Sequence, residues 1–296
     1  MELHTDLLTF PQLDSLKNGG VTRISFGIQT FDAEILKLHA RVSKNYEKLG
    51  SYIEYAKEIG FEKINFDLIY DLIGDSPDKI RKNIEFVKQY QPTSVNYYGL
   101  RLLTDFLREN HTMNYKRRLA YYLLIREELT KIGYIQKNDA IYHKPGFENG
   151  RNFLYEDYVY SKSHTIYGLG VSATSDNNER FAKNVISLEK YKNLLDNNES
   201  TQDFHFSLSE KPYLLYRLYY WLLMYPTMSF ADYEAEYGTG TILKIKEDMS
   251  RLEGEGLVKI EDSSIRLTQK GLFYFMGLED ILMKDYTYEL SLLRKL

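Results

Sequence analysis

At 296 residues the chain is long enough for one large domain or two ordinary ones, and its hydrophobic (43%) and charged (27%) shares are those of a globular protein. Its net charge of -4 excludes a general polyanion binder, because phosphate contacts require clustered cations. It contains no cysteine, which excludes a disulfide framework, a thiolate zinc site, a cysteine nucleophile and an iron–sulfur cluster held by its own thiolates.

Neither the first residues nor the apolar runs suggest targeting to a membrane. Residues 1–6 lack the basic start and apolar run of a signal peptide. The most apolar stretch of the tail, residues 213–225, contains Arg217 and is shorter than the roughly 20 residues that span a bilayer. We therefore expect a cytoplasmic protein with no membrane partner.

Residues 1–100 alternate between helical and strand patterns. A short helix ending at Asn18 is followed by a β-rich run over 21–29, and further strands are predicted over 63–70 and 93–100. The helices predicted between and beside them cover residues 33–38, 45–59 and 77–89. Strands separated by such helices indicate βαβ units and a parallel sheet whose outside is covered by helices.

The rest of the chain has a different pattern. A long helix with a tyrosine- and leucine-rich face, interpreted as a core face, is predicted over 114–132. The tail over 211–280 has winged-helix character, with three helices and a two-stranded wing. We expect three parts: a partial barrel over 1–110, a helical and Gly/Tyr-rich connection that closes the cleft over 111–200, and a helical, winged-helix-like domain over 201–296.

The charge of the tail disfavours a nucleic-acid partner. A winged helix that binds DNA needs a basic recognition surface, yet residues 201–296 hold eleven Lys or Arg against fifteen Asp or Glu. A packing or lid role is favoured instead. The six histidines lack paired metal-ligand spacing, so we interpret them as surface or capping residues and predict no metal ligand.

Polar residues lie near the ends of the predicted strands, where parallel α/β barrels carry their functional groups. Gln29 ends the first strand, Asp67 lies in the second, Gly99 ends the third, and Glu2 stands where one more strand would end. Taken alone, these residues fit equally well a structural role in which each side chain bonds a neighbouring backbone group.

Motifs in a consistent order resemble one family of radical-SAM enzymes, that of oxygen-independent coproporphyrinogen III oxidase and the radical-SAM haem chaperone. Residues 20–32, GVTRISFGIQTFD, resemble the family's G-V-x-R-[IL]-S-x-G-[VI]-Q-[ST]-F-[DN] segment. Further matches follow at residues 65–70 (NFDLIY), 98–100, 144–146 with Asn152 and Tyr155, 168–175 (GLGVSATS), and Arg180-Phe181 with Asn184. With matches in the tail, the resemblance runs from residue 2 to about residue 280.

The resemblance implies an α/β fold: an incomplete, half parallel TIM-like radical-SAM barrel followed by a mainly helical, winged-helix-like C-terminal domain. It implies S-adenosylmethionine (SAM) as a weakly bound cofactor, and a tetrapyrrole substrate or haem as ligand. It assigns no catalytic residue. The family positions that contact SAM or line its cleft are matched here by Glu2, Gln29, Arg41, Asp67, Gly99 and Thr174. Carboxylates can accept hydrogen bonds from SAM hydroxyls or its ammonium, and an arginine can bind its carboxylate with two bonds.

The sequence departs from the family in the parts that run the radical reaction. The family holds a [4Fe–4S] cluster on a C-x3-C-x2-C loop, and this chain has no cysteine. Its first two strands, the glycine-rich SAM loop and most of the third strand also lack counterparts. The family's Y-G-L-P-x-Q is YDLIGD here, at residues 70–75, so that Asp71 adds a charge to the loop over the SAM site.

A half barrel predicts an open strand and an uncovered face. We expect strand 22–29 to form a free edge, and one alternating apolar set to face the open interior, namely Ile24, Phe26, Ile28, Ile64, Phe66 and Leu68. An apolar patch of this kind is rare on monomers. We therefore expect a homodimer, a separate N-terminal half chain as partner, or aggregation.

Three functions remain open at this point, and whether the chain is an enzyme by itself is left undecided. The first is part of a coproporphyrinogen oxidase-like oxidoreductase of tetrapyrrole metabolism, inactive alone because it lacks the cluster loop. The second is a non-catalytic module that binds haem, another tetrapyrrole or a nucleoside. The third is an interaction protein that uses the winged-helix-like tail.

The composition yields one prediction of its own. Because the chain offers no thiolate, we expect anaerobic reconstitution with iron and sulfide to leave it without a cluster. An iron assay and the visible absorption spectrum measure the outcome. Stoichiometric iron with a broad band in the blue would contradict the prediction.

Overall fold

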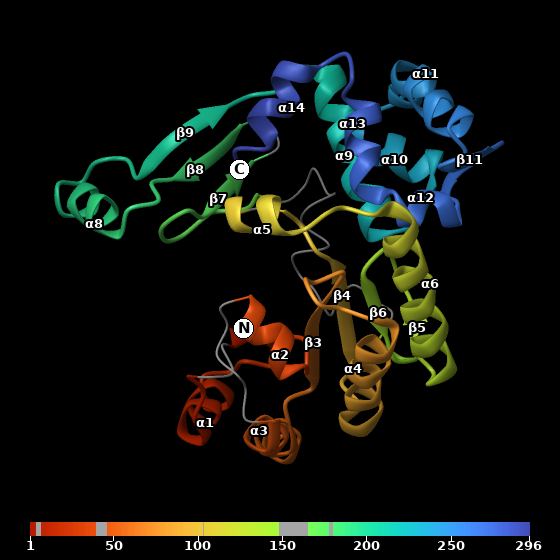
Figure 1. The fold of residues 1–296 in the computed structure, drawn as a ribbon. Helices are drawn as coiled ribbons and strands as arrows, with labels where there is room; N and C mark the ends of the chain where they lie inside the picture. Colours follow the sequence, from red (N-terminus) through yellow and green to blue (C-terminus); the bar gives the residue numbers. More distant parts are fainter. Residues whose placement is uncertain (4–6, 40–45, 103, 148–164, 178–179) are drawn as a thin grey trace. The chain divides into compact units, whose positions relative to one another are not determined.

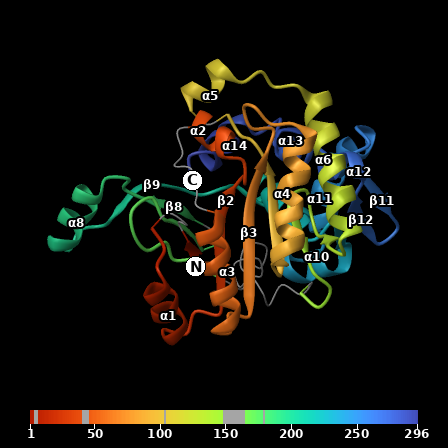
Figure 2. The same cartoon turned by 60° about the horizontal axis from the view of Figure 1, so that its bottom comes forward.

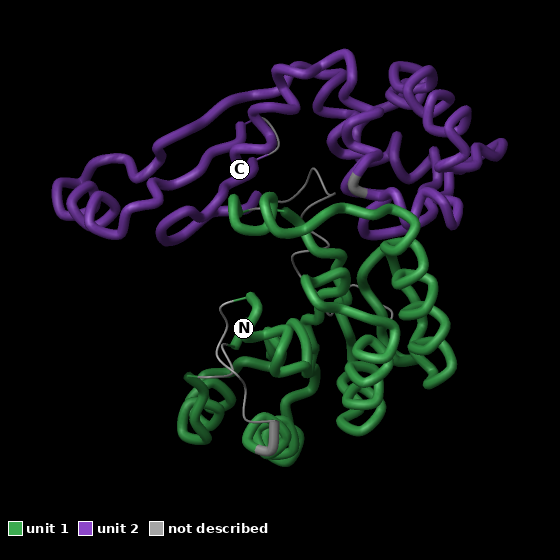
Figure 3. The backbone as a smooth tube through the Cα atoms, viewed as in Figure 1, with its two compact units in different colours: residues 1–152 green, residues 153–296 purple. Residues whose placement is uncertain are grey.

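A computed structural model gives the fold (Figure 1) and describes residues 1–3, 7–39, 46–102, 104–147, 165–177 and 180–296. The chain divides into two compact units, unit 1 with residues 1–152 and unit 2 with residues 153–296 (Figure 3). The three-part division at residues 110 and 200 stays a prediction. Within the described ranges, no helix is both long and apolar enough to cross a membrane.

Unit 1 is built on a six-stranded mixed sheet with the order β1-β2-β3-β4-β6-β5. Four strands are parallel: β1 (Glu2–Leu3), β2 (Arg23–Gln29), β3 (Lys63–Tyr70) and β4 (Ser94–Gly99). The last two, β6 (Ile141–His143) and β5 (Ile135–Gln136), are antiparallel to their neighbours. The predicted strands are confirmed, but the expectation of a purely parallel sheet is wrong because this short hairpin, only two and three residues per strand, follows the long helix.

The helices of unit 1 lie close to their predicted positions, except α5, which was not predicted. They are α1 (Phe10–Asn18), α2 (Ala33–Leu38), α3 (Tyr46–Glu58), α4 (Pro77–Tyr90), α5 (Asp105–Asn110) and α6 (Tyr115–Lys131). Local sequence explains several of their starts. Asp32 accepts a hydrogen bond from the Ile35 backbone at the start of α2, and Ser76 precedes a proline at the start of α4 and accepts from Lys79.

The apolar set of β2 and β3 lies inside the protein, on the face of the sheet that the helices cover. The side chains of Ile24, Phe26 and Phe66 are fully buried. Phe66 contacts Phe31, which stacks on Phe86 of α4 at 4.1 Å between ring centroids, and Figure 2 shows α3 and α4 across the front of these strands. The prediction that this set faces an open interior is therefore wrong, because the polar set takes the other face.

The open edge of the sheet is also not where it was expected. β1 pairs in parallel with the middle of β2, with Glu2 opposite Ser25 and Leu3 opposite Phe26. The Met1 ammonium donates to the Arg23 carbonyl at 2.9 Å, and the Met1 carbonyl accepts from the Ser25 backbone. The edge strand is thus β1, and residues 22–29 do not form a free edge over that stretch.

Unit 2 begins with a three-stranded antiparallel sheet that the sequence patterns did not reveal. It consists of β7 (Thr174–Asp176), β8 (Phe181–Asn184) and β9 (Gln202–Phe206), with α8 (Leu188–Asp196) between the last two. In the tail, three helices and two strands lie near their predicted places: α9 (Glu210–Met224), α10 (Phe230–Tyr237), α11 (Thr241–Gly254), β11 (Val258–Glu261) and β12 (Ser264–Leu267). The third strand β10 (Thr227–Ser229) was not predicted, and in place of one closing helix the structure has α12 (Gln269–Phe273), α13 (Phe275–Leu282) and α14 (Thr287–Leu293).

Helix α9 is the centre of the unit 2 core. Most of its residues are buried, and they contact apolar side chains from the sheet strand β8 and from the helices of the tail. Its one buried cation, Arg217, binds both oxygens of Asp176 on β7 at 2.9 Å and lies over the ring of Tyr213. This buried ion pair joins the small sheet to the helical tail.

A glycine in α12 provides a sharp test of this packing. A Cβ at Gly271 would overlap the Leu257 carbonyl oxygen, so Gly271→Ala must displace backbone, and we expect a loss of at least about 2 kcal/mol in the free energy of unfolding. Gly254→Ala is the control, because a Cβ at Gly254 has open space, and its effect should stay within about 1 kcal/mol. Urea denaturation measures both, and equal effects would contradict the prediction.

Candidate functional site

The face of the unit 1 sheet opposite the helices carries a cluster of polar side chains. Register places Ser25, Asn65 and Ser94 side by side on β2, β3 and β4, and the next row holds Gly27, Asp67 and Asn96. Tyr98 follows two residues beyond Asn96 on the same face. We call these seven residues the polar sheet face.

Hydrogen bonds join the side chains of the polar sheet face into one network centred on Asp67. Its Oδ1 accepts from Asn65 Nδ2 and from Asn96 Nδ2, each at 2.9 Å, and its Oδ2 accepts from the Ser25 hydroxyl. Asn65 Nδ2 also donates to Ser25 Oγ at 2.8 Å, and Ser94 Oγ donates to Asn65 Oδ1 at 2.8 Å. Three strands are therefore linked through their side chains as well as their backbones.

Gly27 leaves a gap in this face, and three predicted site residues surround it. A Cβ at Gly27 would lie 3.2 Å from Gln29 Nε2 and 3.9 Å from Glu2 Oε1, and Asp67 is its register neighbour. The structure thus brings Glu2, Gln29 and Asp67 together around a glycine. Gln29 has a φ of 63°, in the left-handed region that a side chain seldom adopts, and the β2–β3 register shifts between Gly27 and Gln29. Backbone strain of this kind concentrates at functional sites.

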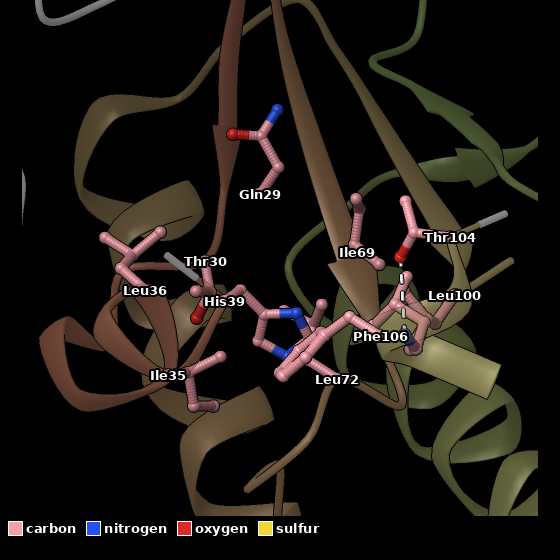
Figure 4. Close-up of a pocket in the computed structure, with 11 residues that line it drawn as sticks. Gln29, Thr30, Ile35, Leu36, His39, Ile69, Leu72, Leu100, Thr104 and Phe106 are labelled. Atoms are coloured by element: carbon pink, nitrogen blue, oxygen red, sulfur yellow. Dashed lines mark hydrogen bonds between the residues drawn. The ribbon is translucent and has the colours of Figure 1, made fainter. Parts of the chain in front are cut away.

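A pocket of about 200 Å³ opens at the carboxyl ends of the strands (Figure 4). Gln29, the last residue of β2, and Thr30, which follows it, line the pocket, and Figure 4 shows the His39 ring between them and Leu72. The rest of its lining is mainly apolar and includes Ile35, Ile69, Leu100 and Phe106. His39 Nε2 accepts a hydrogen bond from the Ile73 backbone at 3.0 Å, so the neutral ring carries its proton on Nδ1.

Asp71, the charge added relative to the family motif, is buried and paired with an arginine. It follows β3 with a φ of 64°, which fits a position where the family has glycine. Arg117 Nε donates to its Oδ1 at 2.8 Å, and His111 Nε2 lies 3.5 Å from its Oδ2. His111 Nε2 also lies 2.8 Å from the Asp71 carbonyl. The carboxylate therefore holds the segment between α5 and α6 against the end of β3.

Gly99 is covered by an arginine. A Cβ at this position would overlap the Arg118 guanidinium, which donates to the Leu100 carbonyl at 2.7 Å and lies over the Tyr70 ring. The glycine thus allows α6 to approach the end of β4. Burial raises the pKa of Tyr70 to about 12, with a smaller opposing effect of Arg118.

The remaining predicted residues lie outside the described ranges or in unit 2. Arg41, Asn152 and Tyr155 lie outside the described residues, and Thr174 belongs to unit 2, on β7. There the glycine motif over 168–175 forms a loop that Asn184 holds, because Asn184 Nδ2 donates to the carbonyls of Gly168 and Gly170. A pocket of about 260 Å³ in unit 2 is lined in part by Thr174, Asp176 and Tyr216.

Sequence patterns found Asp67 but missed most of its partners. Ser25, Asn65 and Asn96 were visible as polar residues at alternate positions of strands, a pattern that indicates one polar face. His111 and Arg117 had no such signal, because they reach Asp71 from a distant helical segment. Among the described residues, no group of three or more histidine or acidic side chains could hold a metal ion.

The pocket region also makes stability depend on pH. Asp75 accepts hydrogen bonds from the backbones of Asp71 and Ser76, and burial raises its pKa from 3.8 to about 6. The folded chain therefore retains a proton that the unfolded chain releases. The stabilisation by this proton is complete below about pH 4 and is lost as the pH rises through 6.

We expect Asp75→Asn to remove this dependence. Between pH 4 and 7, the wild-type free energy of unfolding should fall relative to the variant by up to about 3 kcal/mol. Urea unfolding at the two pH values measures it. Asp78→Asn, which removes an exposed carboxylate from α4, is the control and should follow the wild type. Parallel pH curves for wild type and Asp75→Asn would show that the carboxyl is not protonated in the fold.

Comparison with known proteins finds similarity to radical-SAM proteins. The Radical SAM superfamily model matches residues 2–87. The chain is 24% identical to the oxygen-independent coproporphyrinogen III oxidase of Pseudomonas aeruginosa over 86% of its own length and 59% of that protein. It is 31% identical to the heme chaperone HemW of Lactococcus lactis over 54% of its length and 42% of that protein.

A solved structure has the same fold. Coproporphyrinogen III oxidase from Escherichia coli, described as a radical-SAM enzyme, matches with a TM-score of 0.80 at 20% identity. The match covers 95% of this chain and 68% of that one. The chain thus spans about three fifths of the length of the curated oxidase from P. aeruginosa. The chain is thus similar in sequence to coproporphyrinogen III oxidases and heme chaperones and shares the fold of a radical-SAM coproporphyrinogen III oxidase, and none of its 296 residues is a cysteine.

Proposed function

We propose that this chain binds SAM, or a nucleoside derived from it, on the polar sheet face, as a coproporphyrinogen oxidase-like protein of haem metabolism. One observation carries the proposal: Glu2, Gln29 and Asp67 gather around the gap at Gly27. Carboxylates beside an amide suit a ligand that offers hydroxyl and ammonium donors, and SAM carries both. The missing Cβ leaves room for such a ligand to approach the backbone.

The remaining predicted positions have supporting roles in this proposal. Arg41 is assigned to the carboxylate of SAM, which an arginine can bind with two hydrogen bonds. Gly99 and Thr174 are assigned to the lining of the cleft. Gly99 would act indirectly, since it is Arg118 that lies against it. When bound, SAM supplies a sulfonium group and a ribose diol, and the protein's part is to hold and orient them.

An iron–sulfur cluster does not fit the residues of this chain. Thiolates hold such clusters, and none of the 296 residues is a cysteine. A homodimer would not change this, because a second copy brings no thiolate either. We therefore propose that these 296 residues alone are inactive in radical chemistry, and that any cluster ligands would have to come from residues outside them.

The finer description of the fold belongs to this proposal. We infer that β1 to β4 with their helices correspond to part of a radical-SAM barrel, and that the polar sheet face is its inner surface. The three-stranded sheet β10-β12-β11 with α9, α10 and α11 supports a winged-helix-like tail. The divisions at 1–110, 111–200 and 201–296 follow from this correspondence.

A tetrapyrrole is the second candidate ligand, because two relatives are named as a coproporphyrinogen III oxidase and a heme chaperone. Two observations make a tetrapyrrole a weaker candidate than a nucleoside as the ligand of the pocket at the strand ends. The pocket measures about 200 Å³, below the roughly 300 Å³ at which sites for drug-sized ligands begin. His39, the one histidine in its lining, uses Nε2 to accept the Ile73 N–H.

Calorimetry with SAM tests the proposal. We expect weak binding, with a Kd of about 100 μM or higher, because the iron–sulfur cluster and the glycine-rich SAM loop of the family have no counterpart. Gly27→Ala should abolish it, since a methyl group there fills the gap, while its nearest contact, Gln29 Nε2, is the movable end of a side chain. Gly254→Ala in unit 2 is the matched control and should bind like the wild type. Absence of SAM binding by the wild type would refute the proposal.

A further inference from the structure

The polar sheet face contains a buried hydrogen-bond acceptor that has no donor. Asn96 is only 7% exposed, and its Oδ1 accepts no hydrogen bond from any residue that the structure describes. Leaving a buried acceptor unsatisfied costs stability, so such an atom in a folded protein requires an explanation.

The orientation of the Asn96 amide is fixed by its neighbour. Nδ2 donates to Asp67 Oδ1 at 2.9 Å, and turning the amide over would place Oδ1 against the carboxylate oxygen instead. Two acceptors would then face each other at hydrogen-bond distance. The amide oxygen is therefore held away from Asp67 by the same contact that engages the nitrogen.

Asp67 itself has little capacity left for a ligand. Its two oxygens already accept from Ser25, Asn65 and Asn96, which uses three of the roughly four acceptor positions of a carboxylate. An added donor would compete with bonds that hold three strands together. Asn96 Oδ1, by contrast, accepts no hydrogen bond from the described residues.

A flat side chain lies next to this acceptor. Tyr98 stands on the same face of β4 and is 43% exposed, although it is a large aromatic residue. Burial raises its pKa to about 12, and the Asp67 carboxylate adds to this effect, while a hydrogen bond with Asn96 opposes it. The phenol ring and the Asn96 amide thus share one environment, with an apolar surface beside an acceptor.

We infer that Asn96 Oδ1 accepts a hydrogen bond from a ligand hydroxyl or amino group, and that Asp67 is a positioning residue that orients the Asn96 amide. The inference rests on the proposed function, because the ligand class is the same nucleoside. The ligand contact that was predicted for Asp67 on β3 is thereby assigned to Asn96 on the neighbouring strand β4. The Tyr98 ring offers a stacking surface for the base.

Protein variants test the inference by titration calorimetry with SAM. Asn96→Leu keeps a similar volume but removes the acceptor, and we expect affinity to fall at least tenfold. Asn197→Leu is the matched control: it makes the same substitution at an exposed asparagine, the C-cap of α8 in unit 2, which is not part of the polar sheet face. Its affinity should stay within about threefold of the wild type. Thermal melting of both variants shows whether either has lost its fold.

A ligand series removes the remaining dependence on protein stability. Adenosine is compared with purine riboside, which lacks the amino group, and with 2′-deoxyadenosine and 3′-deoxyadenosine, which each lack one hydroxyl. One of these three nucleosides should bind the wild type about tenfold more weakly than adenosine does. The same nucleoside should bind Asn96→Leu as tightly as adenosine does.

The possible outcomes separate the two proposals. The inference would be overturned if removing a ligand group weakened binding equally in the wild type and in Asn96→Leu. It would also be overturned if Asn96→Leu bound SAM with unchanged affinity. In either case binding by the wild type would leave the proposed function standing. A wild type that binds neither SAM nor adenosine would overturn both.

Discussion

The carboxylate of Asp67 is the constraint on which unit 1 depends. It accepts hydrogen bonds from side chains of β2, β3 and β4, and so it makes one face of the sheet polar over three adjacent strands. The opposite face is then free to be wholly apolar, and Ile24, Phe26 and Phe66 are buried there beneath the helices. A sheet with two faces of different chemistry can have a packed core on one side and receive a ligand on the other.

Element positions in unit 1 could be predicted from the sequence because each signal is local. The alternating pattern of β2, the proline at the start of α4 and the cap at Asp32 act over a few residues. Which face of the sheet meets the helices could not be read from alternation alone, because an alternating strand fits either orientation. The hydrogen bonds of Asp67 decide it, and they depend on register between strands about 30 to 40 residues apart.

The candidate site was predicted in part for the same reason. Motif positions gave Glu2, Gln29 and Asp67, and strand register brings these three together at Gly27. Asn96 had no motif to mark it, and only the geometry shows that its oxygen lacks a donor. The sheet β7-β8-β9 was missed because its strands are three to five residues long and a helix interrupts them, so no periodic pattern develops.

The strand ends show how a local departure from the family is accommodated. Gln29 and Asp71 both take left-handed backbone conformations directly after or at the end of a strand, where glycine would be unstrained. At Asp71 the added charge is paired with Arg117, and the loop becomes an anchor for the next helices. The same departure that changes the loop over the proposed ligand site therefore also fastens α6 to the sheet.

That compensation makes the two partners unequal in their effect on the fold. A buried carboxylate that loses its cation destabilises the protein strongly, whereas an arginine that loses its carboxylate can still reach water, as the 39% exposed side chain of Arg117 indicates. The ion pair therefore tolerates the loss of Asp71 better than the loss of Arg117, and the attachment of α6 to the sheet depends more on the exposed partner than on the buried one.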